Sequence, residues 1–154
     1  MSTEQNKAIV TRFYEELWNQ RNLSVADDIF AADCLTHQLH SGCAASVGMP
    51  RSPEAVKKHV AEWLAGFPDL RFDIEEIVAE VDQVVSRSVM HGIHMGTWLG
   101  LAPTGKEVSI RMSVTHKIKD GKIVEDWVLV EALGFFQQLG LVPATEEILS
   151  RAAR

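Results

Sequence analysis

The sequence is poor in cysteine and contains no long apolar run. Its two cysteines, Cys34 and Cys43, do not form a Cys-x-x-Cys pair, and its six histidines include no His-x-x-x-His or His-Glu-x-x-His motif. We therefore predict no metal site, and we interpret both thiols as ordinary small residues rather than as a disulfide. No apolar segment approaches the roughly 20 residues that cross a membrane. The polar N-terminus lacks a signal-peptide core, so we expect a cytoplasmic protein without a membrane partner.

Basic charge is also scarce. Fifteen Lys and Arg residues stand against 21 Asp and Glu residues, and the formal net charge is −6. No stripe of Lys and Arg is present, so nucleic acid is not an expected partner. A chain of 154 residues that is 46% hydrophobic suits one globular domain with one core. We predict a single domain over residues 1–154.

The first part of the chain has a helical period. Ser2 and Gln5 form a candidate capping box before the first helix. Its apolar residues recur at helical spacing: Ile9, Val10, Phe13, Tyr14, Leu17 and Trp18. Ser24 begins a short second helix that reaches residue 30, and residues 34–50 are predicted to be a loop. Ser52 caps a third helix, which Gly66 and Pro68 end; in it, Trp63 is interpreted as a core residue and His59 as a boundary residue.

After residue 68 the period changes from helical to two. Strands are predicted from residue 70, over 84–98, over 107–119 and over 123–132. Asp120 and Gly121 form a hairpin turn between the last two strands, and a short helix and a helical tail follow. Helices followed by consecutive antiparallel strands predict an α+β fold, a cone-shaped curved antiparallel sheet wrapped around the N-terminal helices. Its apolar interior suits one small apolar metabolite.

Several segments resemble a known family. The stretches GIHMGTWLGLAPTGKEV, DGKIVEDW and LGFFQQLGL, with FYEELWNQRNLSVADDIFAADCLTH and FPDLRF, are similar to SnoaL-like polyketide (ester) cyclases of the nuclear-transport-factor-2-like superfamily. The resemblance covers nearly the whole chain. In the cyclases it implies an intramolecular aldol closure of a polyketide ester without metal or cofactor. An Asp on the last strand is the acid/base, helped by a His on the preceding strand. These two positions align with Val128 and Val114.

Alternation along the last two strands predicts a polar pair on an apolar wall. The even positions of 108–118 and 124–130 are apolar except for His116 and Asp126. A three-residue hairpin loop with a glycine bulge would turn both even faces inward and place His116 opposite Asp126. A two-residue turn would place Glu125 opposite His116 instead.

We expect the facing carboxylate to raise the pKa of the His116 imidazole and to orient it as a general base. The competing interpretation is a structural pair near the end of the hairpin, half in water.

Other candidates lie on the preceding strand and on the helix side. Val85, Val89, Ile93 and Met95 share a phase with Arg87 and His91, so we interpret this face as facing the pocket. Gly92 and Gly96 permit a bulge that turns His94 inward, and His94 also matches a histidine position of the family. The predicted substrate-binding residues are His94, His91, Arg87, Tyr14 and His37. Arg87 and the histidines also have surface interpretations.

Two further features are ambiguous. Glu131 is either a base or a brace for the helix that follows, and the second is favoured. Trp127 and Leu129 on the outer sheet face predict a dimer contact, so we expect a homo-oligomer.

The function expected from these residues is acid/base catalysis on a small carbonyl compound, without a cofactor. His116 would remove a proton α to a carbonyl, Asp126 would orient it, and His94 or Arg87 would stabilise the enolate oxygen. Hydrolysis or isomerisation on the same fold is an alternative, and a binding or oligomeric module without chemistry is another.

Overall fold

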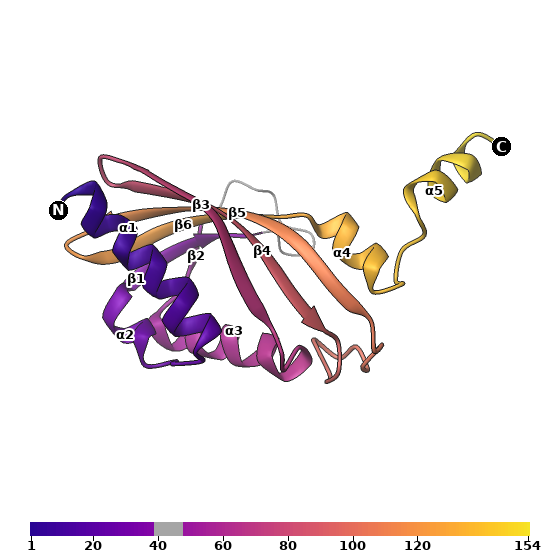
Figure 1. Ribbon diagram of the computed structural model, residues 1–154, viewed down its shortest axis with the longest axis horizontal. Helices are drawn as coiled ribbons and strands as arrows, with labels where there is room; N and C mark the ends of the chain where they lie inside the picture. Colours follow the sequence, from indigo (N-terminus) through magenta and orange to yellow (C-terminus); the bar gives the residue numbers. More distant parts are fainter. Residues whose placement is uncertain (39–47) are drawn as a thin grey trace.

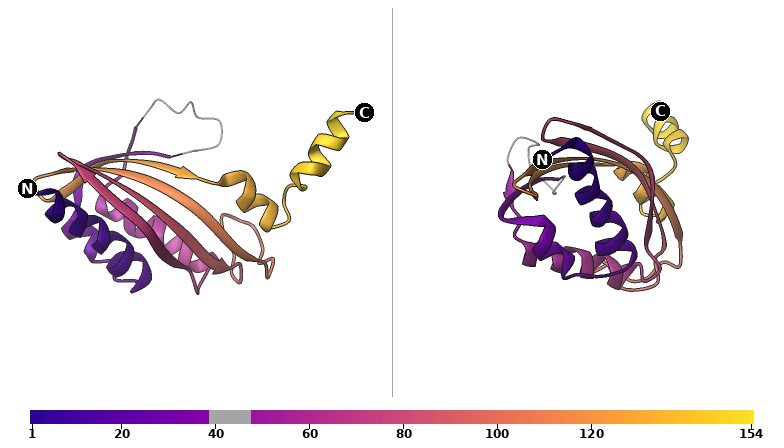
Figure 2. Two further views of the ribbon diagram at one scale, coloured as in Figure 1. Left: turned by 45° about the horizontal axis from the view of Figure 1, so that its top comes forward. Right: turned by 60° about the vertical axis from the view of Figure 1, so that its left-hand side comes forward.

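The computed structural model describes residues 1–38 and 48–154. His40 and Cys43 lie outside the described residues. N-terminal helices pack against one face of a curved sheet, which confirms the predicted α+β fold (Figure 1). Seen from the end, the sheet bends around the helices (Figure 2).

The helices follow the predicted pattern closely. Their bounds are α1 Thr3–Arg12, η1 Phe13–Asn19, α2 Val25–Ile29, α3 Pro53–Gly66, α4 Ala132–Gln138 and α5 Thr145–Ala152. The capping box of Ser2 and Gln5 and the Ser52 cap are both present. After Arg12 the first helix widens into a π-helical segment, η1, which buries the four aromatic and apolar side chains Phe13, Tyr14, Leu17 and Trp18.

The sheet has six strands in the order β2-β1-β6-β5-β4-β3. Their bounds are β1 Phe30–His37, β2 Met49–Pro50, β3 Arg71–Glu80, β4 Gln83–Ile93, β5 Glu107–Lys119 and β6 Lys122–Val130. The four predicted strands pair antiparallel, as expected, whereas β1, which was not predicted, runs parallel to β6. Residues 34–37 were assigned to a loop because residues 34–50 are rich in Gly, Ser and Ala; they form a strand because they pair with β6.

The strand predicted over 84–98 ends earlier, at Ile93. Beyond it the chain packs on the end of α3, where the backbone N–H groups of Met95 and Gly96 both donate to the carbonyl oxygen of Gly66, each at 3.0 Å. The built Cβ of an alanine at position 96 would lie 1.9 Å from the carbonyl oxygen of Ala65. The glycine at this strand end therefore permits a close approach of two backbones.

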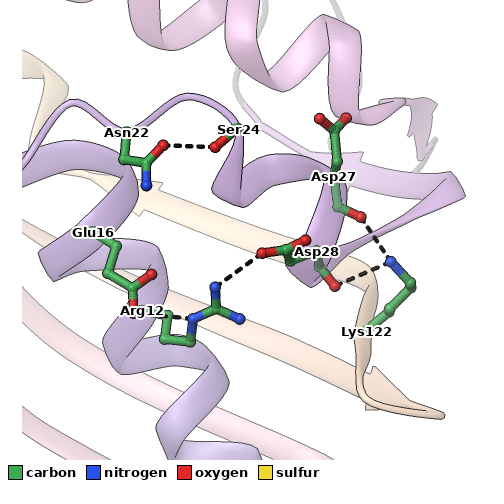
Figure 3. A network of polar contacts seen from close by, with 7 residues as sticks. All are labelled: Arg12, Glu16, Asn22, Ser24, Asp27, Asp28 and Lys122. Atoms are coloured by element: carbon green, nitrogen blue, oxygen red, sulfur yellow. Dashed lines mark hydrogen bonds and ion pairs between the residues drawn. The ribbon is translucent and has the colours of Figure 1, made fainter.

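A polar network ties the helices to the start of β6 (Figure 3). Arg12 donates to Glu16 and to Asp28, each at 3.0 Å. Lys122, the first residue of β6, donates to the backbone carbonyl oxygens of Asp27 and Asp28 at 2.8 and 3.0 Å. These contacts hold β6 against α2.

The β5–β6 hairpin reaches the predicted pairing by a different route. Asp120 and Gly121 both have positive φ and form a two-residue turn, with Lys119 opposite Lys122. The predicted three-residue loop was therefore wrong. The ladder then shifts by one residue, because Lys117 opposes Glu125 while Ile118 opposes Ile123. This bulge restores the register, and the predicted pairing of His116 with Asp126 is confirmed.

Candidate functional site

A cavity of about 80 Å³ lies between the helices and the inner face of the sheet. Its wall is mainly aromatic and aliphatic, and its lining includes Tyr14, Trp18, Arg51, Trp63, Val114, Asp126 and Val128. Aromatic residues of η1 supply one side of the cavity, and alternate residues of β4, β5 and β6 supply the other. A mostly apolar enclosure with few polar groups is the usual form of a small-molecule site.

Asp126 is the acidic side chain in this wall. It is 1% exposed, and its Oδ1 accepts a hydrogen bond from the Thr36 hydroxyl at 2.5 Å. Arg51 Nη1 lies 3.5 Å from Asp126 Oδ2 and 3.4 Å from the Thr36 oxygen. Parallel pairing of β1 with β6 sets Thr36 opposite Asp126, and Arg51 follows directly after β2. Three polar residues from distant parts of the chain thus meet at one point of an apolar wall.

Burial dominates the electrostatics of this cluster. It raises the pKa of Asp126, although the Arg51 charge and the Thr36 hydrogen bond oppose the rise. It also lowers the pKa of Arg51, against the attraction of Asp126. Both shifts have the same cause, since a low-dielectric environment disfavours a charge. The carboxylate is therefore a stronger base than an exposed one.

His116 lies opposite Asp126 but does not hydrogen-bond to it. Its ring packs edge-to-face on Phe13 at 5.0 Å, and both ring nitrogens are buried without a hydrogen-bond partner among the described residues. Burial, and then the nearby Arg51 charge, lower the pKa of His116 to about 3. The predicted rise in its pKa was wrong, because burial and then the Arg51 charge both disfavour the protonated imidazole. His116 is also absent from the described lining of the cavity.

The phase assigned to β4 was wrong as well. The even positions of β4 are buried on the helix side, and Met90 among them lines the cavity. Arg87 and His91 therefore lie on the outer face, where Arg87 pairs with Glu75 at 2.9 Å and His91 lies 3.1 Å from Asp73. The prediction placed them inward because the odd positions of β4 are also apolar. Buried Ser86 and Ser88 occupy the inner face instead.

His94 does turn inward, as predicted, but into the core rather than into the described cavity lining. It stacks on Phe67 at 5.1 Å. Its Nδ1 accepts the Thr104 backbone N–H at 3.1 Å, and Nε2 is buried without a partner among the described residues.

The two candidates predicted on the helix side, Tyr14 and His37, lie in different places. Tyr14 lines the cavity, and its hydroxyl lies 2.8 Å from the Ser86 oxygen. Burial raises the pKa of Tyr14. His37 instead lies on the outer side, since it stacks on Trp127 at 5.1 Å and its Nε2 lies 2.8 Å from a Glu125 oxygen. The predicted position of His37 in the pocket was wrong, because His37 follows Thr36 in β1 and alternate residues face opposite sides.

Sequence reasoning missed Arg51, Thr36 and Gln38, which the structure brings to the cavity or to Asp126. All three belong to or border the stretch interpreted as a loop. His59 and Trp63 also line the cavity, although they were interpreted as boundary and core residues. A basic residue directly before a helix cap was the only available signal for Arg51, and it is a weak one.

Other parts of the chain can be placed briefly. Glu131 stands at the N-terminal end of α4, where its charge suits the helix dipole. Cys34 is buried, and burial raises the pKa of its thiol to about 12. Within the described ranges, no three His, Cys, Asp or Glu side chains gather as a metal site. No described helix is long and apolar enough to cross a membrane.

Comparison with known proteins relates this chain to a family. A comparison with curated protein sequences gave no match. Among solved structures, the chain is similar to IdmH, a putative polyketide cyclase from Streptomyces antibioticus, with 29% identity and a TM-score of 0.75 over 88% of this chain and 99% of that chain. It is also similar to AclR, a putative hydroxylase from Streptomyces galilaeus, with 26% identity and a TM-score of 0.79 over 98% and 95% of the two chains.

The family model for the SnoaL-like polyketide cyclase matches residues 8–139, which run from the middle of α1 through α4 and include every strand of the sheet. The sheet wrapped around its N-terminal helices, the apolar cavity between them and the likeness to IdmH agree with this match. The chain belongs to the SnoaL-like polyketide cyclase family, on the nuclear-transport-factor-2-like fold.

Proposed function

We propose that the protein catalyses an acid/base reaction on a small, largely apolar carbonyl compound, with Asp126 as the acid/base. The observation that carries this proposal is the Asp126 carboxylate, which is nearly fully buried in the cavity wall beside a hydroxyl and a guanidinium. A buried carboxylate with a raised pKa suits proton abstraction near neutral pH. Asp126 thereby takes the role that the sequence pattern assigned to His116.

The proposed reaction is an intramolecular aldol closure. The Asp126 carboxylate takes a proton from the carbon next to a carbonyl, which leaves an enolate. The enolate carbon attacks a second carbonyl of the same molecule and a carbon–carbon bond forms. The new alkoxide takes the proton back from Asp126. Atoms and charge balance without a further reactant.

Arg51 is suited to stabilise the oxygen on which negative charge develops. Its guanidinium bonds to Thr36 and Asp126 only through Nη1, and among the described residues Nε and Nη2 have no partner. A fixed cation in a site with little water stabilises an enolate more strongly than one in bulk solvent. Arg51 replaces Arg87 and His94 in this role.

The cavity also suggests a substrate class. Its wall includes the rings of Tyr14, Trp18 and Trp63, which favour a flat, unsaturated ligand, while the polar groups cluster near Asp126. A volume of about 80 Å³ favours a ligand, or the reacting part of one, of roughly one ring. We therefore propose an aromatic β-keto ester or a related keto compound.

Exchange at an acidic carbon tests the proton transfer directly. With an aryl β-keto ester in D₂O, at a pD where uncatalysed exchange is slow, NMR measures loss of the α-proton signal. Asp126→Asn should slow the catalysed exchange by about 100-fold or more, the usual weight of a general base. Asp73→Asn on the outer face is the matched control and should retain wild-type exchange.

Two further variants distinguish the alternatives. Arg51→Met should slow exchange, whereas His116→Leu should leave it within about threefold, since His116 is outside the cavity lining. Loss of exchange in His116→Leu with retention in Asp126→Asn would restore His116 as the base and reject this proposal. Ligand-induced thermal stabilisation of the wild type without exchange would indicate a binding module instead.

A further inference from the structure

Three buried hydroxyl groups gather where η1 packs on the inner face of β4. The side chains of Tyr14, Ser86 and Ser88 are each at most 1% exposed. The Tyr14 hydroxyl lies 2.8 Å from Ser86 Oγ, and both serines partly offset the rise in the pKa of Tyr14 that burial causes. We define these three residues as the hydroxyl cluster. The aldol closure proposed above uses none of these hydroxyls.

The hydroxyl cluster belongs to the wall of the cavity. Tyr14 is a lining residue, and its ring packs edge-to-face on Phe72, another lining residue, at 5.4 Å between ring centroids. Ser88 lies on the inner face of β4 beside two more lining residues, since Met90 follows it on that face and Met112 opposes it on β5. A polar group of a ligand in the cavity can therefore approach these hydroxyls.

The segment that carries Tyr14 is fixed to the sheet. Asn19, the last residue of η1, donates its side-chain amide to the Phe72 carbonyl oxygen at 2.9 Å and accepts the Phe72 backbone N–H at 2.8 Å. Short π-helical segments such as η1 are frequent at functional sites. A hydroxyl held in place in this way needs no reorganisation when charge develops on a ligand beside it.

Ser88 has a polar atom that the protein leaves unsatisfied. Its Oγ is fully buried and has no hydrogen-bond partner among the described residues. A buried hydroxyl without a partner destabilises the folded state, so such a group calls for an explanation. A ligand oxygen bound at the hydroxyl cluster supplies the missing partner.

The hydroxyl of Tyr14 can be turned toward a ligand. Ser86 Oγ donates to the Val114 carbonyl oxygen at 3.3 Å, so Tyr14 donates to Ser86 in this structure. Each hydroxyl has one donor and can also accept. With a ligand oxygen beside Tyr14, the chain reverses: Ser86 donates to Tyr14, and Tyr14 donates to the ligand. Burial raises the pKa of Tyr14, so this hydroxyl keeps its proton at neutral pH and remains a donor.

The hydroxyl cluster and Asp126 lie on opposite sides of the cavity. Ser86 on β4 opposes Val114 on β5. Val114 in turn opposes Val128 on β6, two residues from Asp126. Neighbouring strands are about 4.8 Å apart, so β4 and β6 are separated by about 10 Å. A ligand that reaches both polar groups carries two oxygen functions at separate positions.

We propose that the hydroxyl cluster binds the second carbonyl oxygen of the substrate, the one that becomes an alkoxide when the ring closes. This inference rests on the proposed function. Asp126 and Arg51 act on the first carbonyl and its acidic carbon. As the carbon–carbon bond forms, the electron pair of the second carbonyl moves onto its oxygen, to which Tyr14 donates a hydrogen bond while keeping its own proton. The alkoxide then takes its proton from Asp126, so the substrate class narrows to a dicarbonyl compound with separated carbonyl groups.

The ratio of ring closure to α-proton exchange tests this role. The probe is a β-keto ester whose chain carries an aryl ketone, placed so that attack by the acidic carbon closes a six-membered ring, and NMR follows both rates. Tyr14→Phe keeps the ring and removes the hydroxyl, so it should lower the ratio by about 100-fold, the usual weight of one such donor. Ser113→Ala removes a hydroxyl opposite Arg87 on the outer face and should retain both rates. An unchanged ratio in Tyr14→Phe would overturn the proposal.

Infrared spectroscopy measures the contact without turnover. In Asp126→Asn, which lacks the proposed base, the probe carries ¹³C at the aryl carbonyl. Its bound band should lie at lower wavenumber than in Asp126→Asn/Tyr14→Phe, because a hydrogen bond weakens the carbonyl bond. Equal wavenumbers would reject the oxygen site even if the wild type catalyses exchange. A band that depends on Tyr14 in a protein whose wild type shows no exchange would support the oxygen site and reject only the proposed function.

Discussion

The His116 imidazole lies against Phe13 with both nitrogens buried, and no described residue hydrogen-bonds to it. An unpaired polar group in such a place costs free energy of folding. The neutral form is the only one the site tolerates, and the pKa of His116 falls to about 3 for this reason. The facing Asp126 shifts the other way, because burial raises the pKa of a carboxyl group. The two neighbours therefore make opposite contributions to stability as pH changes.

The His116 contribution gives the clearer prediction. The pKa of His116 is about 3 in the folded protein, against a reference value of 6.5. Its contribution to the free energy of unfolding is therefore fully present above pH 6.5 and is lost as pH falls toward 3. The free energy of unfolding should fall by about 2 kcal/mol between pH 7.5 and 5 through this residue alone. Asp126 has a raised folded pKa, so its own contribution is lost as pH rises, in the opposite direction.

Urea unfolding of wild type and His116→Leu at several pH values measures the difference. The variant should lose this acid-dependent slope. Relative to pH 7.5, its free energy of unfolding at pH 5 should rise by about 2 kcal/mol compared with that of the wild type. His91→Leu removes a histidine from the outer face and should keep the wild-type slope. Equal slopes in the wild type and His116→Leu would show that the imidazole is not held neutral.

At this scale the sequence could predict which residues oppose each other but not their hydrogen bonds. Two polar residues on one apolar phase of adjacent strands identify His116 and Asp126 as neighbours. The partners that Asp126 uses are Thr36 and Arg51, which are 90 and 75 residues away. Only the parallel pairing of β1 brings them near, and no local pattern announces such a pairing.

At the scale of secondary-structure elements, the composition of β4 explains why its inward face was predicted wrongly. On β4 the outer positions include Val85 and Val89, while the inner positions include Ser86 and Ser88. Ser86 is tolerated at an inner position because the Tyr14 hydroxyl lies 2.8 Å from its side-chain oxygen. Apolarity therefore gives the wrong face for β4 and the right face for β5. On β6 the extra residue near Glu125 corrected the register, although the turn itself has two residues and not three.

The contact between α3 and the chain after β4 depends on a glycine. Gly96→Ala should destabilise the protein by more than about 2 kcal/mol, because its Cβ would lie 1.9 Å from a backbone oxygen of Ala65 that cannot move alone. Gly100→Ala is the control, since nothing lies within 4 Å of its built Cβ and only its positive φ is unfavourable. That variant should lose about 1 kcal/mol. Thermal unfolding compares the two, and equal losses would show that the close approach does not matter.

For the whole molecule, the family resemblance predicted the fold and the interior cavity, and general physical patterns predicted most of its elements. β1 and β2 were the main gap, since they pair with β6 and with each other rather than showing a strand pattern of their own. The proposed acid/base site lies at this end of the sheet, where Arg51, Thr36 and Asp126 meet. The sequence could suggest the cavity beside them but not its volume or its full lining.

An open cavity costs stability, so filling it should separate stability from function. Val128→Phe adds a ring to the wall of a cavity of about 80 Å³, on the strand that carries Asp126. The variant should gain about 1 kcal/mol and a few degrees in Tm, because a void is replaced by packed atoms. It should at the same time lose catalysed α-proton exchange, since the ligand no longer fits. Val85→Phe on the outer face is the matched control and should change neither property. A destabilised Val128→Phe that still exchanges would mean that the ligand occupies another site.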